Sequence, residues 1–298
     1  MISRQSILFF GLGQMGRELV RHLISSGHDI TGIDPNDSAR EKCKDMGLHL
    51  LQSVGEVRDR PEYVFACVPY PHDLVQIASW CNMLPDAYRP TFLINLSTIG
   101  PKASLEVEQI CTNVVFVECP ITGGVIRASR KEITLLCGCR KVELLEDILP
   151  LLHQIAAKVI VMRNVYDTSI AKLVNNLVSI NNALGTIEAL GFGLKAGIPM
   201  EMLFNALENG TANSYVLSST LRRSLLEGDF ETGFALHLAL KDLRLAAQAA
   251  EELHCQMPHL EVNLRELADT FDMGYGDLVF SSVALHHGLV ERRDPEAH

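Results

Sequence analysis

The sequence predicts an α/β protein in which an N-terminal Rossmann dinucleotide-binding domain precedes an all-helical C-terminal domain. Up to residue 164, short apolar runs alternate with segments of helical spacing, which is typical of a parallel sheet covered by helices. After that point we find helical spacing and no convincing strand. A glycine-rich turn follows the first apolar run. We therefore place the two domains at residues 1–164 and 165–298.

The elements of the first domain alternate in order along the chain. The apolar runs predict strands at 6–10, 29–34, 48–51, 63–68, 91–95, 114–118, 133–138 and 158–162. The periodic segments predict a first helix that stops at Gly27, and further helices at 37–46, 72–82, 102–111 and 141–155. Alternation of this kind favours a mostly parallel sheet with helices on both faces.

The second domain is read as helices alone, at 165–195, 200–208, 214–227, 234–254, 259–273 and 277–288. The first of these is strongly apolar, but four asparagines and Glu188 within 173–194 disfavour a bilayer span, and we expect no membrane association. A helix this apolar is better buried inside the protein or against a second chain. We therefore expect a homodimer or homotetramer.

Composition excludes several classes of function. Apolar residues make up 47% and charged residues 21%, which indicates a globular chain, and the net charge of −10 argues against a nucleic-acid partner. The eight cysteines form no C-x-x-C pair and are read as small buried hydrophobes in a reducing, cytoplasmic compartment, although Cys137 and Cys139 leave a metal or redox role open. We predict no metal site, and expect His286 and His287 to be surface residues rather than ligands.

The turn "GLGQMG" supplies the candidate cofactor residues Gly11, Leu12, Gly13, Gln14, Met15 and Gly16. In G-x-G-x-x-G the glycines permit a tight turn, approach of the backbone to a pyrophosphate and close helix packing, and the following helix N-terminus offers N–H groups. Asp34 ends the second predicted strand, where an acid suits the ribose 2′-hydroxyl of NAD and repels a 2′-phosphate. The first nearby cation, Arg40, is six positions further on. The expected cofactor is NAD rather than NADP.

A second loop, "VECPITGG" at 117–124, follows a strand end. Gly123 and Gly124 leave backbone N–H groups accessible, and Thr122 adds a hydroxyl, so the loop suits a carboxylate at the carboxyl end of a sheet. The alternative is a plain glycine turn between strands. The expected partner is thus a small-molecule carboxylate substrate.

Lys172 and Asn176 lie four residues apart in "IAKLVNNLVSINN", on one face of a predicted helix. A partly desolvated lysine can exchange protons near neutrality, and an amide can orient a hydroxyl without adding charge. The alternative is a lysine whose stem passes its apolar neighbours to reach water. Lys241 beside Asp242 forms an ion pair in one interpretation and contacts the cofactor in the other.

Taken in order, the segments "GLGQMG", "CVPYP", "NLSTIGP", "ECPITGG", "KLVNN" and "KDLRLA" resemble the β-hydroxyacid dehydrogenase family over residues 6–285. The resemblance implies NAD(P)-dependent oxidation of a small 3-hydroxy acid to its semialdehyde, or the reverse. It also implies that Lys172 is the catalytic acid/base, Asn176 orients the substrate, and Thr122, Gly123 and Gly124 hold its carboxylate. Cofactor contacts are implied for Val68, Pro69, Thr98 and Lys241.

The sequence departs from the family pattern at several positions. Glu118 and Cys119 stand where the family has Asp and Ala, and Lys131, Tyr166 and Thr168 stand at family glycines. These changes leave the shape of the cleft open, as does Arg127, which either pairs with a second anionic group of the substrate or faces solvent. Two alternatives therefore stay: an imine-reductase-like enzyme, which generally lacks a lysine at position 172, and a dinucleotide-binding sensor or scaffold without turnover.

Overall fold

The computed structural model describes residues 4–292, so the ends of both predicted domains lie outside the described residues. The described chain divides into two compact units, the first ending at Lys172 and the second beginning at Leu173. The boundary lies within helix α7 (Val165–Lys195), a short way beyond the predicted position at 164. The first two turns of α7 therefore belong with the N-terminal unit.

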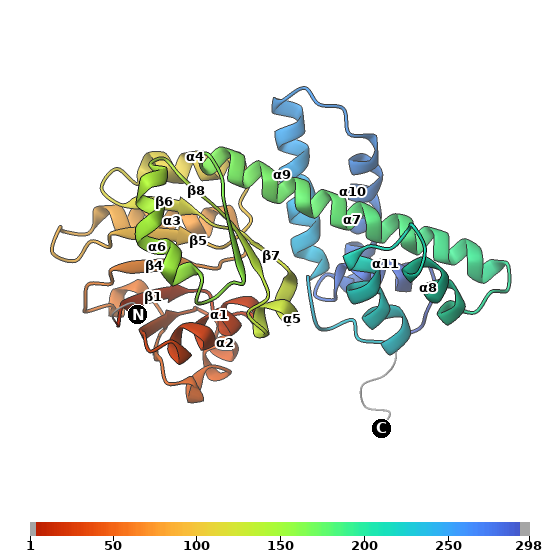
Figure 1. Ribbon diagram of the computed structural model, residues 1–298, viewed down its shortest axis with the longest axis horizontal. Helices are drawn as coiled ribbons and strands as arrows, with labels where there is room; N and C mark the ends of the chain where they lie inside the picture. The colour runs from red at the N-terminus through yellow and green to blue at the C-terminus, as the bar shows by residue number, and fades with distance from the viewer. Residues whose placement is uncertain (1–3, 293–298) are drawn as a thin grey trace. The chain divides into compact units, whose positions relative to one another are not determined.

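Nine strands of the described chain form one sheet in the N-terminal unit, in the order β3-β2-β1-β4-β5-β6-β8-β7, with β9 against β8 (Figure 1). The strands are β1 (Ser6–Phe10), β2 (Asp29–Ile33), β3 (His49–Leu51), β4 (Tyr63–Ala66), β5 (Phe92–Asn95), β6 (Val115–Glu118), β7 (Ile121–Thr122), β8 (Thr134–Cys139) and β9 (Lys158–Val161). Strands β1 to β6 are parallel, and β8 runs antiparallel to both β6 and β7. Reversal of strand order at β1 gives the doubly wound arrangement that binds nucleotides at its switch point.

Each face of this sheet carries its own apolar core, because alternate residues of a strand point to opposite faces. Phe9 of β1 lies in a core with Leu19 and Leu23 of α1 (Gln14–Ser25) and with residues of α6 (Leu145–Leu152). Its neighbours Leu8 and Phe10 lie in the other core, with residues of α3 (Pro71–Met83) and α4 (Pro101–Ile110). The predicted α/β fold with helices on both faces is thereby confirmed.

Two local predictions need correction, and two short elements were not predicted. The predicted helix 37–46 is α2 (Asp37–Glu41) followed by a 3₁₀ turn at Lys44–Met46, which ends at the left-handed Gly47. The helix expected at 141–155 starts as a 3₁₀ turn (Val142–Leu144), and α6 stops at Leu152, two residues after Pro150. Between β6 and β8 the chain also forms β7 and a short helix, α5 (Gly124–Ser129), for which glycines and a two-residue strand give almost no periodic signal.

The C-terminal unit is helical, as predicted. It contains α7 from Leu173 onward, α8 (Met200–Glu208), α9 (Leu236–Glu252), α10 (Pro258–Thr270) and α11 (Val283–His286), with a 3₁₀ turn at Phe280–Ser282. Helices α9 and α10 pack side by side (Figure 1). The predicted helix 214–227 is π-helical at Leu217–Leu221 and Arg223–Glu227. After α10 the segment Phe271–Tyr275 is kinked, because Gly274 has a left-handed backbone (φ +88°).

Helix α7 is the one helix in residues 4–292 that is long and apolar enough to span a bilayer by length and composition. One third of its most apolar window is buried (33%), and core helices of soluble proteins meet the same two criteria. Its exposed apolar side chains, among them Val174, Val178 and Phe192, form an apolar face of the helix.

Candidate functional site

The glycine loop joins β1 to α1 with two contacts that only glycine allows. Gly11 has φ +91°, and a Cβ there would lie 2.1 Å from the carbonyl oxygen of Cys67. A Cβ on Gly16 would lie 1.9 Å from the carbonyl oxygen of Gly11, so α1 packs directly on the turn. Leu12 is buried between them. The loop is therefore held rigidly against the sheet.

Gly13 differs from these two glycines, because no atom lies within 4 Å of the position where its Cβ would be. It is the N-cap of α1, whose first residues Gln14 and Met15 present backbone N–H groups at the positive end of the helix. The open backbone at an N-terminus without a capping side chain fits the pyrophosphate of a dinucleotide.

Asp34 follows β2 and is bonded to the loop itself. Its Oδ2 accepts a hydrogen bond from the N–H of Leu12 (2.8 Å), and its Oδ1 accepts one from the N–H of Asn36 (2.8 Å). The Arg40 guanidinium donates to the Asp34 carbonyl and pairs with the Asp37 carboxylate. The carboxylate of Asp34 thus lies beside the phosphate turn, where a ribose hydroxyl is expected, and the nearest cation is engaged by a second acid.

The two further loops predicted to contact the cofactor leave the carboxyl ends of β4 and β5. The N–H of Val68 donates to Oγ of Ser97 (2.8 Å), which joins one loop to the other. Pro69 is exposed and Thr98 is half-buried beside these residues. Sequence reasoning missed Ser97, whose position between Leu96 and Thr98 gave no sign that it links the loops.

The predicted carboxylate loop contains a short strand and the start of a short helix. Ile121 and Thr122 form β7 against β8, and the chain then turns through Gly123 (φ +132°) and Gly124 (φ +73°) into α5. Helix α5 begins at Gly124. Apart from its chain neighbours and the backbone of the helix itself, no atom lies within 4 Å of a Cβ built on Gly124. The loop can therefore receive a small anion, while Arg127 is half-buried in the last turn of α5.

Lys131 ends α5 in a conformation that favours glycine. Its φ is +60°, and its N–H donates to the carbonyl of Ala128 in a helix-ending turn. A side chain in the left-handed region costs roughly 1 kcal/mol compared with glycine. The position of Lys131 thus requires a left-handed backbone, which explains why the family has glycine there.

We expect the Lys131→Gly variant to raise the free energy of unfolding of the N-terminal unit by about 0.5–1 kcal/mol. Glycine relieves the left-handed backbone strain of the folded state, and the greater conformational freedom of glycine in the unfolded chain cancels only part of this gain. Urea unfolding monitored by Trp80, the single tryptophan of the chain, measures this unit. Arg130→Gly, one residue earlier with φ −95°, is the control and should be destabilising.

Behind the carboxylate loop lies a buried acid that sequence reasoning noted only as a departure from the family. Glu118, at the end of β6, is fully buried; both its oxygens accept from Nδ2 of Asn95 (3.1 Å each), and Oε2 lies 3.1 Å from Oγ of Ser104. The Ser104 hydroxyl also lies 3.0 Å from the Gly100 carbonyl. Burial raises the pKa of Glu118 to about 8, against a smaller lowering by the two hydrogen bonds.

The hydrogen bonds fit a protonated Glu118. The Ser104 hydroxyl has a single proton, and if it donates to Gly100 its oxygen is left to accept from the Glu118 carboxylic acid. Asn95 also donates to Ser97 and accepts from its N–H. A neutral Glu118 therefore ties the Ser97 loop to the start of the carboxylate loop.

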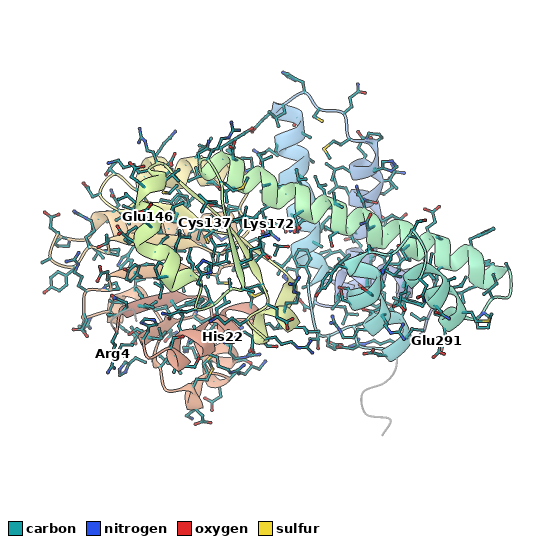
Figure 2. All side chains as sticks on the ribbon, viewed as in Figure 1. Arg4, His22, Cys137, Glu146, Lys172 and Glu291 are labelled. Atoms are coloured by element: carbon teal, nitrogen blue, oxygen red, sulfur yellow. The ribbon has the colours of Figure 1, made fainter. Side chains whose placement is uncertain are left out.

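Lys172 and Asn176 lie one turn apart on α7, and both are buried, at 8% and 7% exposure (Figure 2 labels Lys172). Nδ2 of Asn176 donates to Oδ2 of Asp242 on α9 (2.6 Å), and its Oδ1 accepts from Asn175 (3.1 Å). A carboxylate only accepts hydrogen bonds, so Asp242 fixes which end of the amide faces it. This places the amide of Asn176 in one orientation.

The sequence did not reveal the contact of Asp242 with Asn176. Asp242 is 3% exposed, and its Oδ1 pairs with Nζ of Lys241 at 3.0 Å. The ion pair foreseen for Lys241 is present, and its contact with the cofactor stays a prediction. The pattern Lys-Asp on a helix is common on surfaces, so only the packing distinguishes this buried pair.

Tyr166 and Thr168, at two family glycines, lie in the first turn of α7. Thr168 is buried, and its hydroxyl donates to the Asn164 carbonyl (2.7 Å). The opposing residue is Gly138, where a Cβ would come within 2.2 Å of that hydroxyl. The larger side chain at 168 is thus accommodated by a glycine on β8, and the helix starts without distortion.

Two family models match the chain. One, described as the NAD binding domain of 6-phosphogluconate dehydrogenase, matches residues 6–163, and the other, described as the NAD-binding of NADP-dependent 3-hydroxyisobutyrate dehydrogenase, matches residues 167–284. Together they cover both units. They establish an NAD(P)-binding oxidoreductase.

Among known proteins, a probable mitochondrial 3-hydroxyisobutyrate dehydrogenase of Arabidopsis thaliana is 26% identical, over 95% of this chain and 87% of its own length. The 2-(hydroxymethyl)glutarate dehydrogenase of Eubacterium barkeri is 24% identical, over 84% of each chain. The structure of Mycobacterium tuberculosis 3-hydroxyisobutyrate dehydrogenase with L-serine superposes with a TM-score of 0.83 at 25% identity, covering 97% of this chain and all of its own (100%). The chain belongs to the β-hydroxyacid dehydrogenase family.

Proposed function

We propose that this protein is an NAD-dependent dehydrogenase that interconverts a small 3-hydroxy acid and its semialdehyde, with Lys172 as the proton partner. The observation that carries the proposal is the buried lysine on α7, one turn from an asparagine whose amide is oriented by Asp242. A lysine that is 8% exposed and lies one turn from a fixed amide is placed to pass a proton to or from a substrate oxygen.

In the oxidative direction, the proposed roles divide between the two polar residues of α7. Neutral Lys172 takes the proton from the substrate hydroxyl, and Asn176 holds the same oxygen through its fixed amide. A bound nicotinamide cofactor would supply the hydride acceptor for this oxidation. In the reductive direction Lys172 returns the proton to the oxygen of the aldehyde.

The substrate carboxylate is proposed to bind Thr122, Gly123 and Gly124. Support comes from the open backbone at Gly124 and from the hydroxyl of Thr122 at the end of β7. Thr122, Gly123 and Gly124 are neutral, so Arg127 is the residue of this loop that would bind a second anionic group. One relative is a dehydrogenase of a glutarate derivative, which carries two carboxylates.

Absorbance at 340 nm, with purified protein and NADH or NADPH, tests the proposal against small aldehyde acids. The panel contains methylmalonate, tartronate, succinate and malonate semialdehydes and glyoxylate, with imines as the comparison class. Oxidation of NADH by one of the aldehyde acids supports the proposal. Binding of both cofactors without turnover would instead favour the sensor, and turnover of imines alone would favour the imine reductase.

For the cofactor, the proposal is NAD, supported by the position of the Asp34 carboxylate and by the ion pair that engages Arg40. Asp34→Ser should weaken NADH binding by about 10–100-fold and narrow the gap to NADPH, because a hydrogen bond to a charged group is worth roughly 1.5–3 kcal/mol. Calorimetric titration with each cofactor measures this. Asp45→Ser, which changes an exposed aspartate on the 3₁₀ turn after α2 and leaves Asp34 and Asp37 in place, should keep the preference for NADH; equal loss in both variants would contradict the role of Asp34.

The proposed assembly is a homodimer or homotetramer in which the exposed apolar face of α7 meets another copy, in a cytoplasmic setting. We expect sedimentation to show an oligomer and Val178→Asp to shift it toward monomer, because the new carboxylate would lose its water in the interface. The control is Glu188→Asp, farther along the same helix. A monomer before mutation would contradict the assembly.

A further inference from the structure

One cluster of titratable side chains in the C-terminal unit takes no part in the proposed reaction. Glu266 on α10 and the neighbouring residues His286 and His287 at the end of α11 each direct one ligand atom to the same place. These three atoms lie within 4.8 Å of one another. Glu266 and His286 are half-buried, so two of the three groups are already held by packing.

The arrangement of the two imidazoles resembles that of two ligands on one ion. Their ring centres are 5.4 Å apart and the ring planes meet at 76°. Two imidazoles that bind a tetrahedral zinc ion through nitrogens at about 2.0 Å have their ring centres about 5 Å apart, so little movement is needed. Nε2 of His287 is 2.7 Å from Oε2 of Glu266, a contact that a tetrahedral ion between them would lengthen by roughly 0.6 Å.

A second hydrogen bond orients His286. The Thr270 hydroxyl lies 2.8 Å from the carbonyl of Glu266, to which it donates, and 2.9 Å from Nδ1 of His286. Threonine has one hydroxyl proton, so Nδ1–H donates to Thr270 and the lone pair of this tautomer lies on Nε2. Metal-binding histidines commonly have their second nitrogen held in this way.

We propose that Glu266, His286 and His287 form a binding site for a divalent transition ion, zinc being the ion that the two nitrogens and one carboxylate oxygen suit. Three protein ligands leave the fourth position to water. The ion would join α10 to α11, and the site is independent of the proposed dehydrogenase chemistry. His287 is exposed, as predicted, and His286 is half-buried; the proposal adds a ligand role that the sequence did not predict for either.

The experiment titrates the full chain with Co²⁺ and Zn²⁺ after removal of bound metal by a chelator. It uses the Cys255→Ser variant as parent, because Cys255 is the exposed cysteine and binds such ions by itself. We expect one Co²⁺ per chain with the intense visible absorption of a four-coordinate ion, displaced by Zn²⁺, and a higher melting temperature with Zn²⁺.

In that parent, His287→Gln and Glu266→Gln should each weaken Zn²⁺ binding by at least about tenfold, since each removes one of three ligands. His259→Ala removes an exposed imidazole from the same helix α10 and should change nothing. Circular dichroism verifies that the variants fold. The proposal is overturned if the parent binds Zn²⁺ no more tightly than His287→Gln, or if its Co²⁺ complex has the weak spectrum of the hydrated ion.

Discussion

Lys172→Ala is expected to lower turnover by about 10²–10⁴-fold, the range by which a positioned acid/base accelerates proton transfer. The alanine leaves the substrate oxygen without a proton partner in the step that makes or breaks the carbonyl. The affinity of the variant for NADH should stay within about twofold of that of the parent, because binding of the cofactor does not require the proton transfer. Steady-state kinetics at 340 nm and calorimetry with NADH separate the two effects.

The matched control is Lys195→Ala, an exposed lysine in the last turn of the same helix, which should retain turnover. Lys172→Arg should be nearly as inactive as the alanine variant, because a guanidinium keeps its charge and cannot accept the proton. Small primary amines added to Lys172→Ala should restore part of the rate. Full turnover in the alanine variant would remove Lys172 from the mechanism.

Glu118 should make the N-terminal unit less stable as the pH rises. Its pKa is raised by burial to about 8 in the folded chain, from an ordinary value of 4.5. Between these values the folded state holds a proton that the unfolded state has lost, so the free energy of unfolding falls with increasing pH and levels off above the folded value. Over the whole window this amounts to about 5 kcal/mol.

Glu118→Gln tests this expectation, because an amide has the shape of the protonated acid and can still donate to Ser104 and accept from Asn95. At about pH 9 the variant should exceed the parent in free energy of unfolding by roughly 3–5 kcal/mol, and near pH 4 the two should converge. Urea unfolding monitored at Trp80 reports on the same unit.

Glu106→Gln is the matched control, since Glu106 is exposed on α4, the helix that carries Ser104. It should leave the pH dependence of unfolding unchanged. Parallel pH profiles for Glu118→Gln and the parent would show that Glu118 is ionised in the folded chain, and the arrangement of protons between Asn95 and Ser104 would then need revision.

The amino-acid sequence by itself determined the two-domain fold and the cofactor loop. Alternation of apolar runs with helical segments is a local property, and the glycines at 11, 13 and 16 act through backbone geometry that neighbouring residues fix. Lys172 and Asn176 were also readable, because helical spacing alone puts them on one face. The resemblance to a family added roles to residues that were already conspicuous.

The tertiary structure decided which polar residues are paired across elements distant in sequence. Asn176 and Asp242 are 66 residues apart, and Glu118 and Asn95 are 23 apart, so no local pattern announces either hydrogen bond. The pKa of Glu118 depends on complete removal of water, which only packing of the sheet and α4 produces. The cluster of Glu266, His286 and His287 likewise exists only because α10 packs against α11, and no local sequence pattern links these two helices.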